Sequence, residues 1–397
     1  MNGIDGDVLI AGGGVAGLSA AAILAARGFS VICADPVPPV TSPGAAGADP
    51  RSTAFLGPSV ALLRGCGLWD RLGGEAAPLR VMRIVDAGGA AERRADFDAG
   101  ELGAEPFGYN LPNWLLRREM VAHLEATPGA RLLAPARVAG VVARADRAMV
   151  RLGDGESLSA RLVIAADGRD SGLRAAAGIG ARRWGYGQKG LVFTARHDRP
   201  HDGVSTEVHL TGGPFTLVPL PDDARGHRSA VVWMERGPRA LELAAMPEQD
   251  FEAEMNARSA GVLGRLTLEG GRAVWPIVAQ IADRLDAPRM ALIAEAAHVV
   301  PPIGAQGLNM SLADIGTLAD LLAAARDAGE DIGAPAVLAR YHRARHGRVL
   351  ARILGIDALN RAAMAEARPL RRLRRLGLGV LSGVPPLRHA AMRLGLG

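Results

Sequence analysis

The stretch DVLIAGGGVAGLSAAAILAARG, residues 7–28, is the most informative part of this sequence about its fold. It begins with a short apolar run that is typical of a buried parallel strand. Three glycines follow at the G-x-G-x-x-G spacing, and an Ala- and Leu-rich segment then predicts a helix that ends near Arg27 and Gly28. A second apolar run, residues 29–34, ends at Asp35. The stretch and its continuation therefore predict a β-α-β unit.

This unit has the features of a dinucleotide site. Gly12 permits a tight turn, Gly14 lets a pyrophosphate approach the backbone, and Gly17 lets the helix and strand pack closely. The helix N-terminus offers free N–H groups and a partial positive charge to phosphates. Asp35 stands where a carboxylate accepts hydrogen bonds from a ribose diol. The unit alone does not distinguish FAD from NAD(P).

The composition limits the classes to which the protein belongs. A chain of 397 residues suggests two to three domains, and 49% hydrophobic with 22% charged residues indicates a well-packed globular protein. Cys33 and Cys66 lack paired spacing, which argues against a disulfide framework or a zinc site and favours a reducing, cytoplasmic setting. The net charge of +5 comes from arginine, with Lys189 the only lysine, and no nucleic-acid motif accompanies it. We therefore expect neither a metal nor a nucleic-acid partner.

Two later segments repeat the pattern of a strand followed by a turn. Residues 162–166, LVIAA, predict a buried strand, Asp167-Gly168 a turn, and Ser171 the N-cap of a helix. Residues 290–294, MALIA, predict another buried strand, followed by EAAHVVPPIGAQGLN at 295–309. An amphipathic helix then begins, and its apolar stripe consists of Leu308, Leu312, Ile315, Leu318 and Leu322.

The loop before that helix is suited to a planar ligand. Pro301 and Pro302 exclude a helix before the glycines, while Gly304 and Gly307 permit close approach. The backbone amides that open the helix would face the ligand and stabilise negative charge on it.

On these segments the sequence resembles the single-component aromatic flavin monooxygenases of the para-hydroxybenzoate hydroxylase type, and within them the ubiquinone-biosynthesis (2-polyprenylphenol) hydroxylases. The resemblance covers almost the whole chain and includes DPRSTAFLGPSVALLRGCGLWDRL (49–72), FGYNLPNWLLRREMVAHL (107–124), RRWGYGQKGLVF (182–193) and GGPFTLVPL (212–220). It implies an α/β fold with a Rossmann-like FAD-binding domain, a mixed-sheet substrate domain and C-terminal helices. It also implies FAD as the cofactor and NAD(P)H as the reductant.

The resemblance assigns roles to individual residues. Gly12, Gly14, Gly17 and Asp35 would hold the ADP half of FAD. Arg51 and Arg117 fall where family arginines approach the cofactor, Arg117 opening the Arg-x-x-Met-x-x-x-Leu helix, although a solvated surface role stays open for both.

Two further motifs complete the implied site. Asp167-Gly168 matches the Asp-Gly motif that the family associates with both FAD and NAD(P)H. The loop beside the isoalloxazine ring is matched by Pro302, Gly304, Gln306, Gly307, Leu308 and Asn309. No side chain is typical of a general base, so no catalytic residue is named.

One motif departs from the family pattern. The family's usual Gly-Asp-Ala-Ala-His is Ala294-Glu295-Ala296-Ala297-His298 in this chain. In relatives the aspartate bonds a ribityl hydroxyl, and glutamate keeps the charge on a longer side chain. Losing one such bond costs about 0.5–1.5 kcal/mol, or about 1.5–3 if charge-assisted, so we expect the FAD site to survive. His298 lacks other ligands at metal-binding spacing and is interpreted as a buried structural histidine.

The cofactor segments are spread along the chain, so the predicted FAD-binding domain is discontinuous and comprises 1–75, 107–180 and 275–330. Alternating stretches in 76–106 and 181–274 predict a separate mixed sheet that would roof the flavin and form the substrate pocket. The remaining residues, 331–397, form a C-terminal region with helices around 335–365.

The last part of this region, 368–397, is a basic amphipathic segment. Its arginines, set among leucines, are Arg368, Arg371, Arg372, Arg374 and Arg375. Such a segment is able to lie on an anionic membrane surface, or to pack on the FAD-binding domain with a solvated arginine face. Both interpretations stay open.

The expected function is NAD(P)H-dependent hydroxylation of an aromatic ring with O₂, on a polyprenylated phenol of ubiquinone biosynthesis. The enzyme would be cytoplasmic or peripheral on the inner face of the membrane, within reach of a biosynthetic complex. Two alternatives stay open: a hydroxylase of a small soluble phenol in secondary metabolism or aromatic degradation, and a non-catalytic FAD-fold scaffold that has lost turnover. A single G-x-G-x-x-G argues against a reductase with two dinucleotide domains.

Overall fold

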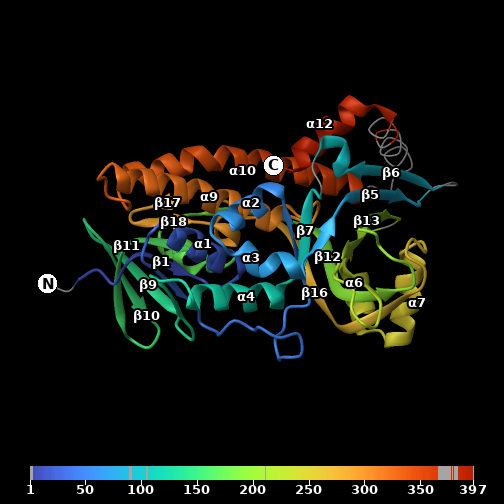
Figure 1. The fold of residues 1–397 in the computed structure, drawn as a ribbon, viewed down its shortest axis with the longest axis horizontal. Helices are drawn as coiled ribbons and strands as arrows, with labels where there is room; N and C mark the ends of the chain where they lie inside the picture. Colours follow the sequence, from blue (N-terminus) through green and yellow to red (C-terminus); the bar gives the residue numbers. More distant parts are fainter. Residues whose placement is uncertain are drawn as a thin grey trace.

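The computed structural model describes residues 3–88, 92–103, 106–210, 212–364, 377, 379 and 383–396. Two eight-stranded sheets lie toward opposite ends of an elongated molecule, and two long helices run along one side of it (Figure 1). A small three-stranded sheet completes the β-structure of the described residues.

The first sheet contains the predicted β-α-β unit. Its strands are β1 (Gly6–Ala11), β2 (Val31–Ala34), β8 (Ala130–Leu133), β9 (Val138–Ala143), β10 (Ala148–Leu152), β11 (Ser157–Ala165), β17 (Asp286–Ala287) and β18 (Met290–Leu292). The order β18-β11-β1-β2-β8 is parallel throughout, whereas β10 pairs with β11 in the antiparallel sense. The predicted strands at 7–11, 29–34, 162–166 and 290–294 are therefore confirmed, within one to two residues at most ends.

Four helices share one hydrophobic core with this sheet. They are α1 (Val15–Ala26), α4 (Asn113–Glu125), α9 (Gln306–Asp327) and α10 (Pro335–Met364). In α9 the predicted stripe is confirmed, since Leu312, Ile315, Leu318 and Leu322 are all buried. Leu308 packs against the same core while remaining partly exposed. Arg117 does not open its helix as expected, because α4 already begins at Asn113.

The second sheet is the predicted mixed sheet. Its strands are β5 (Val81–Asp86), β6 (Arg93–Asp98), β12 (Ala181–His197), β13 (Val204–His209), β14 (Pro214–Pro219), β15 (His227–Arg236), β16 (Leu266–Ala282) and β19 (His298–Val299), paired in the order β19-β16-β12-β15-β14-β13-β5-β6. Two helices, α6 (Gly237–Ala245) and α7 (Glu248–Arg258), cover one face. The core between the sheet and these helices contains the aromatic residues Phe193, Phe215, Trp233 and Phe251.

The remaining elements are short, apart from the final helix. The third sheet contains β3 (Ser52–Leu56), β4 (Ala77–Leu79) and β7 (Gly108–Pro112). The short helical elements are α2 (Gly57–Gly65), α3 (Trp69–Leu72), η1 (Gly73–Glu75), η2 (Ala99–Leu102), α5 (Gly172–Ala176), α8 (Ala294–Ala297) and the final α12 (Pro385–Leu396). Residues 36–50 form a long loop without helix or strand.

Two expectations about the C-terminal region have different outcomes. Helices were expected around 335–365, and the structure has one continuous helix there, α10, which spans Pro335–Met364. The arginine cluster at 368–375 lies outside the described residues. Among the described residues one helix, α9, has the length and apolar composition to cross a membrane, and half of that stretch is buried inside the protein, as in a core helix. The predicted domain boundaries stay a prediction.

Candidate cofactor site

The glycine-rich turn between β1 and α1 is shaped for a ligand on one side only. A Cβ on Gly17 would lie 1.8 Å from the Gly12 carbonyl oxygen, and a Cβ on Gly12, where φ is +117°, would lie 2.3 Å from the Ala166 oxygen. A Cβ on Gly14 would meet nothing within 4 Å. Gly12 and Gly17 are thus required by the fold, whereas Gly14 borders open space.

The start of α1 presents N–H groups that no side chain caps. Gly14 is the N-cap residue, no side chain caps the helix, and no acidic residue lies in its first turn. Free N–H groups and the helix dipole therefore point toward the open space beside Gly14, which is the arrangement that binds phosphates. This observation shows that the residues present fit a dinucleotide such as FAD.

Asp35 closes the turn from the end of β2. Its Oδ2 accepts a hydrogen bond from the Gly13 N–H at 2.6 Å, and its Oδ1 accepts one from Val37 at 2.9 Å. A Cβ on Gly13 would lie 2.9 Å from the Asp35 Cβ, so Gly13 is a fourth glycine that the turn needs. Each carboxylate oxygen is able to accept a second hydrogen bond, so Asp35 can still accept one from a ribose hydroxyl.

A second group of polar residues is organised by Asp49, a residue that the sequence did not single out. The Arg51 Nε and Nη2 donate to Oδ1 and Oδ2 of Asp49 at 2.8 and 2.7 Å. Oδ2 also accepts from Asn113 at 2.9 Å and from Arg117 at 3.4 Å. Burial alone would raise the pKa of Asp49, but the bonds and charge of Arg51, together with Asn113, lower it to about 2. The two predicted arginines therefore converge on one buried carboxylate.

Arg51 reaches from this group toward the second sheet. Its guanidinium lies over the Trp275 ring of β16, 4.8 Å from the ring centroid. The charges of Asp49 and of Glu295 both contribute to raising the pKa of Arg51 against the opposing effect of burial. Arg51 thus stands between segments from three parts of the chain, at the junction of the two sheets.

The Asp-Gly turn after β11 is fixed by its own aspartate. Asp167 accepts a hydrogen bond from the Ser171 hydroxyl at 2.5 Å and another from the Leu173 N–H at 3.1 Å. Ser171 in turn accepts from the Arg174 N–H, which confirms it as the N-cap of α5. Gly168 adopts φ +91°, a conformation that favours glycine.

This turn is joined to the Glu295 segment by two arginines. Arg169 lies 3.4 Å from the Glu295 carboxylate, and the buried Arg174 donates to the Ala296 carbonyl at 2.9 Å. The Glu295 side chain is 46% exposed, so the longer residue reaches outward to Arg169. Ala294 has φ +55°, the left-handed region that the family's glycine at this position adopts without strain.

His298 ends the Glu295 segment in a fully buried ionic group. Its Nε2 lies 2.5 Å from Asp314 Oδ2, and Arg345 Nε donates to Asp314 Oδ1 at 2.6 Å. The interpretation of His298 as a buried structural histidine is confirmed, since it is 2% exposed and pairs with Asp314. The trio ties the segment to α9 and α10.

The loop at 301–309 turns sharply into α9. Gly304 and Ala305 both have positive φ, 61° and 57°, and Ala305 is the N-cap of α9 without a side-chain capping bond. The N–H groups that open α9 are therefore unpaired with any capping side chain, as at α1. Such a helix start stabilises negative charge on a group placed before it.

The two polar side chains of this loop are committed to protein partners. Asn309 Oδ1 accepts a hydrogen bond from the Leu56 N–H at 2.9 Å, and its Nδ2 donates one to the Ala54 carbonyl at 2.8 Å. These two bonds attach Asn309 to strand β3. Gln306 donates to the Gly304 carbonyl at 2.8 Å and to the Gly395 carbonyl of α12 at 2.9 Å. These bonds hold the loop, and they leave its backbone amides to face a ligand.

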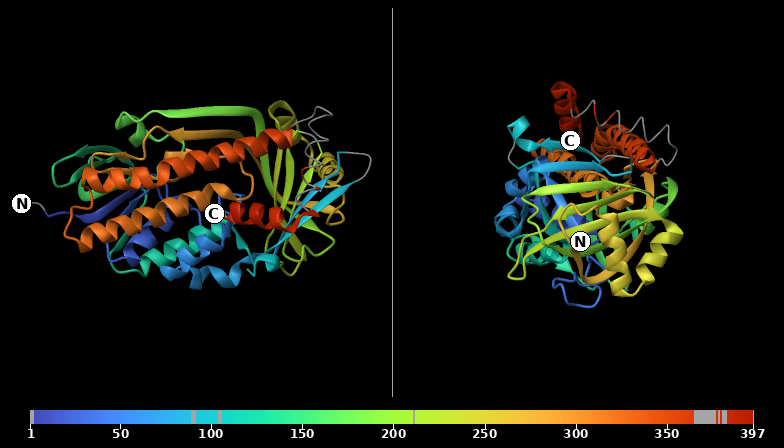
Figure 2. Two further views of the ribbon diagram at one scale, coloured as in Figure 1. Left: turned by 90° about the horizontal axis from the view of Figure 1, so that it is seen from above. Right: turned by 90° about the vertical axis from the view of Figure 1, so that its right-hand side faces the viewer.

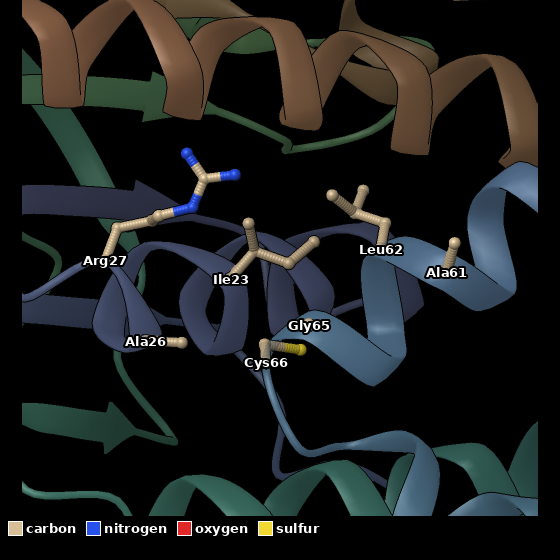
Figure 3. A pocket seen from close by; sticks show the side chains of 7 residues that line it. All are labelled: Ile23, Ala26, Arg27, Ala61, Leu62, Gly65 and Cys66. Carbon is tan, nitrogen blue, oxygen red and sulfur yellow. The ribbon is translucent and has the colours of Figure 1, made fainter.

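Two surface hollows lie elsewhere. One, of about 160 Å³, is lined by the C-terminal half of α1 and by α2, where Ile23 and Arg27 face Leu62 and Cys66 (Figure 3). Arg27 there forms an ion pair with Asp320 of α9. The other, of about 440 Å³, lies over the second sheet beside α7 and is lined by residues such as Trp233 and Arg258. Neither borders the Gly14 turn.

The comparisons agree with this geometry. The family model for an FAD binding domain matches residues 5–353. Ubiquinone hydroxylase UbiL of Rhodospirillum rubrum is 39% identical over 391 residues, which are 98% of this chain and 89% of that protein. 3-Demethoxyubiquinol 3-hydroxylase of Escherichia coli is 29% identical over 98% of each chain. The solved structure of p-nitrophenol 4-monooxygenase PnpA from Pseudomonas putida matches with a TM-score of 0.82, covering 100% of this chain and 99% of that one at 21% identity, a likeness of fold.

Proposed function

This chain belongs to the FAD-dependent hydroxylases of ubiquinone biosynthesis, and from that premise we propose that it hydroxylates the aromatic ring of a prenylated phenol with NAD(P)H and O₂. The observation that carries the proposal is the open, uncapped turn at Gly14, in a chain 39% identical to a ubiquinone hydroxylase over nearly its full length. It fits an FAD site in use rather than a scaffold that has lost its cofactor.

We assign the holding of FAD to residues that lie on either side of the junction between the sheets. The turn at Gly12, Gly14 and Gly17 would receive the pyrophosphate, and Asp35 the adenosine ribose. Arg51 and Arg117, oriented by Asp49, would approach the cofactor with their positive charge. Asp167 and Gly168 support this placement by fixing the turn that carries Arg169 toward Glu295.

The loop before α9 would lie beside the isoalloxazine ring. Its members in this proposal are Pro302, Gly304, Gln306, Gly307, Leu308 and Asn309. When bound, FAD supplies the transfer of electrons from the reduced nicotinamide and the activation of O₂. The uncapped start of α9 would then stabilise the negative charge of the reduced ring, as an electrostatic device already in place before reaction.

The protein's remaining task is placement of the phenol. Trp275 of β16 lies beneath the Arg51 guanidinium at the junction, and we propose that the phenol ring binds beside it, against the second sheet. An electron-rich phenol needs exclusion of water more than a strong base, so no general base is assigned. A prenyl tail is favoured by the names of the relatives, which act in ubiquinone biosynthesis.

The test begins with the colour and spectrum of the purified protein. Bound FAD would give a yellow protein, and each of NADH and NADPH would be offered with phenols that carry prenyl chains of increasing length. Product oxygen derived from isotopically labelled O₂ would show hydroxylation by mass spectrometry. A colourless protein that FAD does not reconstitute would overturn the proposal.

The same assay distinguishes the substrate classes. Turnover of prenylated phenols, with small polar phenols poor, would support ubiquinone-type chemistry. Turnover of small phenols alone would assign the chain to aromatic degradation or secondary metabolism instead. We further propose that the enzyme works at a membrane surface or in a biosynthetic complex, because a prenylated phenol resides in lipid.

A further inference from the structure

The exposed large hydrophobic side chains are concentrated in one region. Among the described residues ten such side chains are exposed, and half of them lie on α10, on α12 or directly before α12. Their exposed fractions are 55% for Leu354, 60% for Leu359, 39% for Val384, 48% for Leu387 and 73% for Leu394. We name the surface of α10 and α12 that carries them the α10–α12 face. Clustering of this kind marks an interaction surface, since single exposed apolar residues are ordinarily scattered.

The charges on the same two helices have one sign. Six arginines lie in α10 and two in α12, against a single acidic residue, Asp357. Three of these arginines, Arg340, Arg345 and Arg388, pair with carboxylates of other segments. The Asp357 carboxylate is already engaged, because it accepts from Trp184 and Tyr186 at 2.8 and 2.7 Å and pairs with Arg361. Arg343, Arg348 and Arg393 are exposed on the same two helices as the leucines. The α10–α12 face is therefore apolar at its protruding positions and basic around them.

The position of α12 relates this face to the cofactor loop. Arg388 and His389 pair with Glu101 of η2, at 2.7 and 3.0 Å, at one end of the helix. At the other end the Gly395 carbonyl accepts from Gln306, in the loop before α9, and the Leu394 carbonyl accepts from Arg352 of α10. Figure 2 shows α12 beside α10 on one side of the molecule. The face thus borders the junction where we place the aromatic ring.

We propose that the α10–α12 face docks on an anionic lipid surface, with its leucines in the headgroup boundary and its arginines on lipid phosphates. The inference rests on the proposed function, because a membrane-borne phenol is what would make such docking useful. Leucine side chains inserted among arginines that reach outward are the composition of an interfacial helix. Docking would hold the junction beside α12 close to the layer that carries the substrate.

Charge decides between lipid and a second copy of this chain. Two copies meeting through this face would bring arginines against arginines, with no free carboxylate on either helix to pair with them. An anionic bilayer supplies the missing negative charge over the whole face.

The test measures co-sedimentation of the FAD-loaded protein with vesicles. Vesicles of phosphatidylcholine and phosphatidylglycerol in equal amounts would be compared with pure phosphatidylcholine. We expect binding to the anionic vesicles that weakens with added salt. The pair Leu354→Glu with Leu359→Glu should lower the partition coefficient by about tenfold or more, since both leucines would otherwise leave water.

A matched control and a second pair guard the interpretation. Leu241→Glu replaces a leucine of similar exposure, 52%, on α6 at the far side of the second sheet, and should leave vesicle binding unchanged. Leu387→Glu with Leu394→Glu should reproduce the loss from α12. Retained FAD and an unchanged unfolding temperature would show that each variant is folded.

Several outcomes would overturn the proposal. Unchanged vesicle binding in both leucine pairs would place any membrane contact elsewhere, including the arginine-rich segment at 368–375. A change in oligomeric state on size-exclusion chromatography, with vesicle binding intact, would assign the face to protein contacts. Hydroxylation of a short-chain phenol without vesicles separates the two claims: lost docking leaves it intact, whereas failure of the proposed function abolishes it in every variant.

Discussion

The carboxylate of Asp314 accepts a hydrogen bond from the His298 ring at 2.5 Å, in a position where both side chains are excluded from solvent. Because a carboxylate only accepts, His298 Nε2 must donate. Arg345 holds the second carboxylate oxygen at 2.6 Å. One buried anion therefore joins the segment after Glu295 to the two long helices, α9 and α10.

Removing that anion should be among the most damaging single changes. Asp314→Ala would leave the Arg345 guanidinium buried without its partner, at a cost of about 3–5 kcal/mol in the free energy of unfolding. Urea unfolding of the FAD-loaded protein measures this cost. The matched control is Glu330→Ala, which breaks the exposed pair with Arg340 and should cost about 1 kcal/mol or less. Equal costs for the two variants would contradict the assigned role.

Glu295 offers a test on affinity. Its carboxylate now lies beside Arg169 at 3.4 Å, half exposed, whereas a shorter aspartate would remain nearer the backbone of α8. We expect Glu295→Asp to tighten FAD binding by up to about tenfold, the worth of one recovered hydrogen bond. Titration of the apoprotein with FAD, followed by fluorescence, measures the change. Arg169→Ala is the companion variant, since it releases Glu295 without altering its length. Unchanged or weaker binding in Glu295→Asp would mean that the loop has adapted to glutamate.

Substitution of Asp49 should lower the affinity for FAD, because Asp49 positions two arginines. Asp49→Asn keeps the shape but removes the charge that orients Arg51 and Arg117, so FAD affinity should fall by about tenfold or more. The control is Asp96→Asn, which breaks a similar two-point pair with Arg83, at 2.8 Å for both bonds, within the second sheet. That variant should keep wild-type FAD affinity. Equal losses in both variants would refute a specific role for Asp49.

The same residue predicts a dependence on pH. Because the pKa of Asp49 in the folded protein is lowered to about 2, its ionised form stabilises the fold above its unfolded pKa of about 3.9. This stabilisation is lost as the pH falls from about 4 toward 2. The difference in unfolding free energy between wild type and Asp49→Asn should therefore be constant above about pH 5 and shrink below about pH 4. A difference that grows on acidification would contradict the lowered pKa.

The sequence predicted the parts of the site that depend on neighbouring residues. The strands around the glycines, the Ser171 cap and the α9 stripe each follow from a local pattern, and each is present. The role of Asp49 could not be predicted from the sequence, because one of its partners lies in a loop and the others lie in helix α4. No sequence periodicity links these positions. The Asn309 contact with Leu56 joins residues 253 positions apart, so it requires the tertiary structure.

Substitution of Asn309 should lower the stability of the protein, by an amount that depends on whether the new side chain can donate a hydrogen bond. Its amide donates to Ala54 and accepts from Leu56, which fixes the α9 loop against β3. Asn309→Asp keeps the acceptor but places a carboxylate oxygen against the Ala54 carbonyl, and should cost about 2–3 kcal/mol. Asn309→Ala should cost less, because it removes the amide without placing a charge against the Ala54 carbonyl. Thermal unfolding with and without FAD measures both, and a milder effect for Asp than for Ala would contradict the bonding pattern.

The glycines of the first turn separate folding from ligand binding. Gly17→Ala would force a Cβ to within 1.8 Å of the Gly12 carbonyl oxygen, so the turn must rearrange and the protein should fail to fold stably. Gly14→Ala meets nothing within 4 Å and keeps an extended backbone at φ −67°, ψ 174° that alanine also adopts. Its apoprotein should retain wild-type stability within about 1 kcal/mol.

The added methyl group would nevertheless occupy the space where we place the pyrophosphate. We therefore expect Gly14→Ala to weaken FAD binding by at least about tenfold while its circular dichroism and apoprotein unfolding remain those of the wild type. Gly140→Ala, at another glycine with open surroundings on strand β9, should change neither property. Because Gly14 has no role in packing, an FAD affinity equal to that of the wild type in Gly14→Ala would show that the dinucleotide does not lie against this turn.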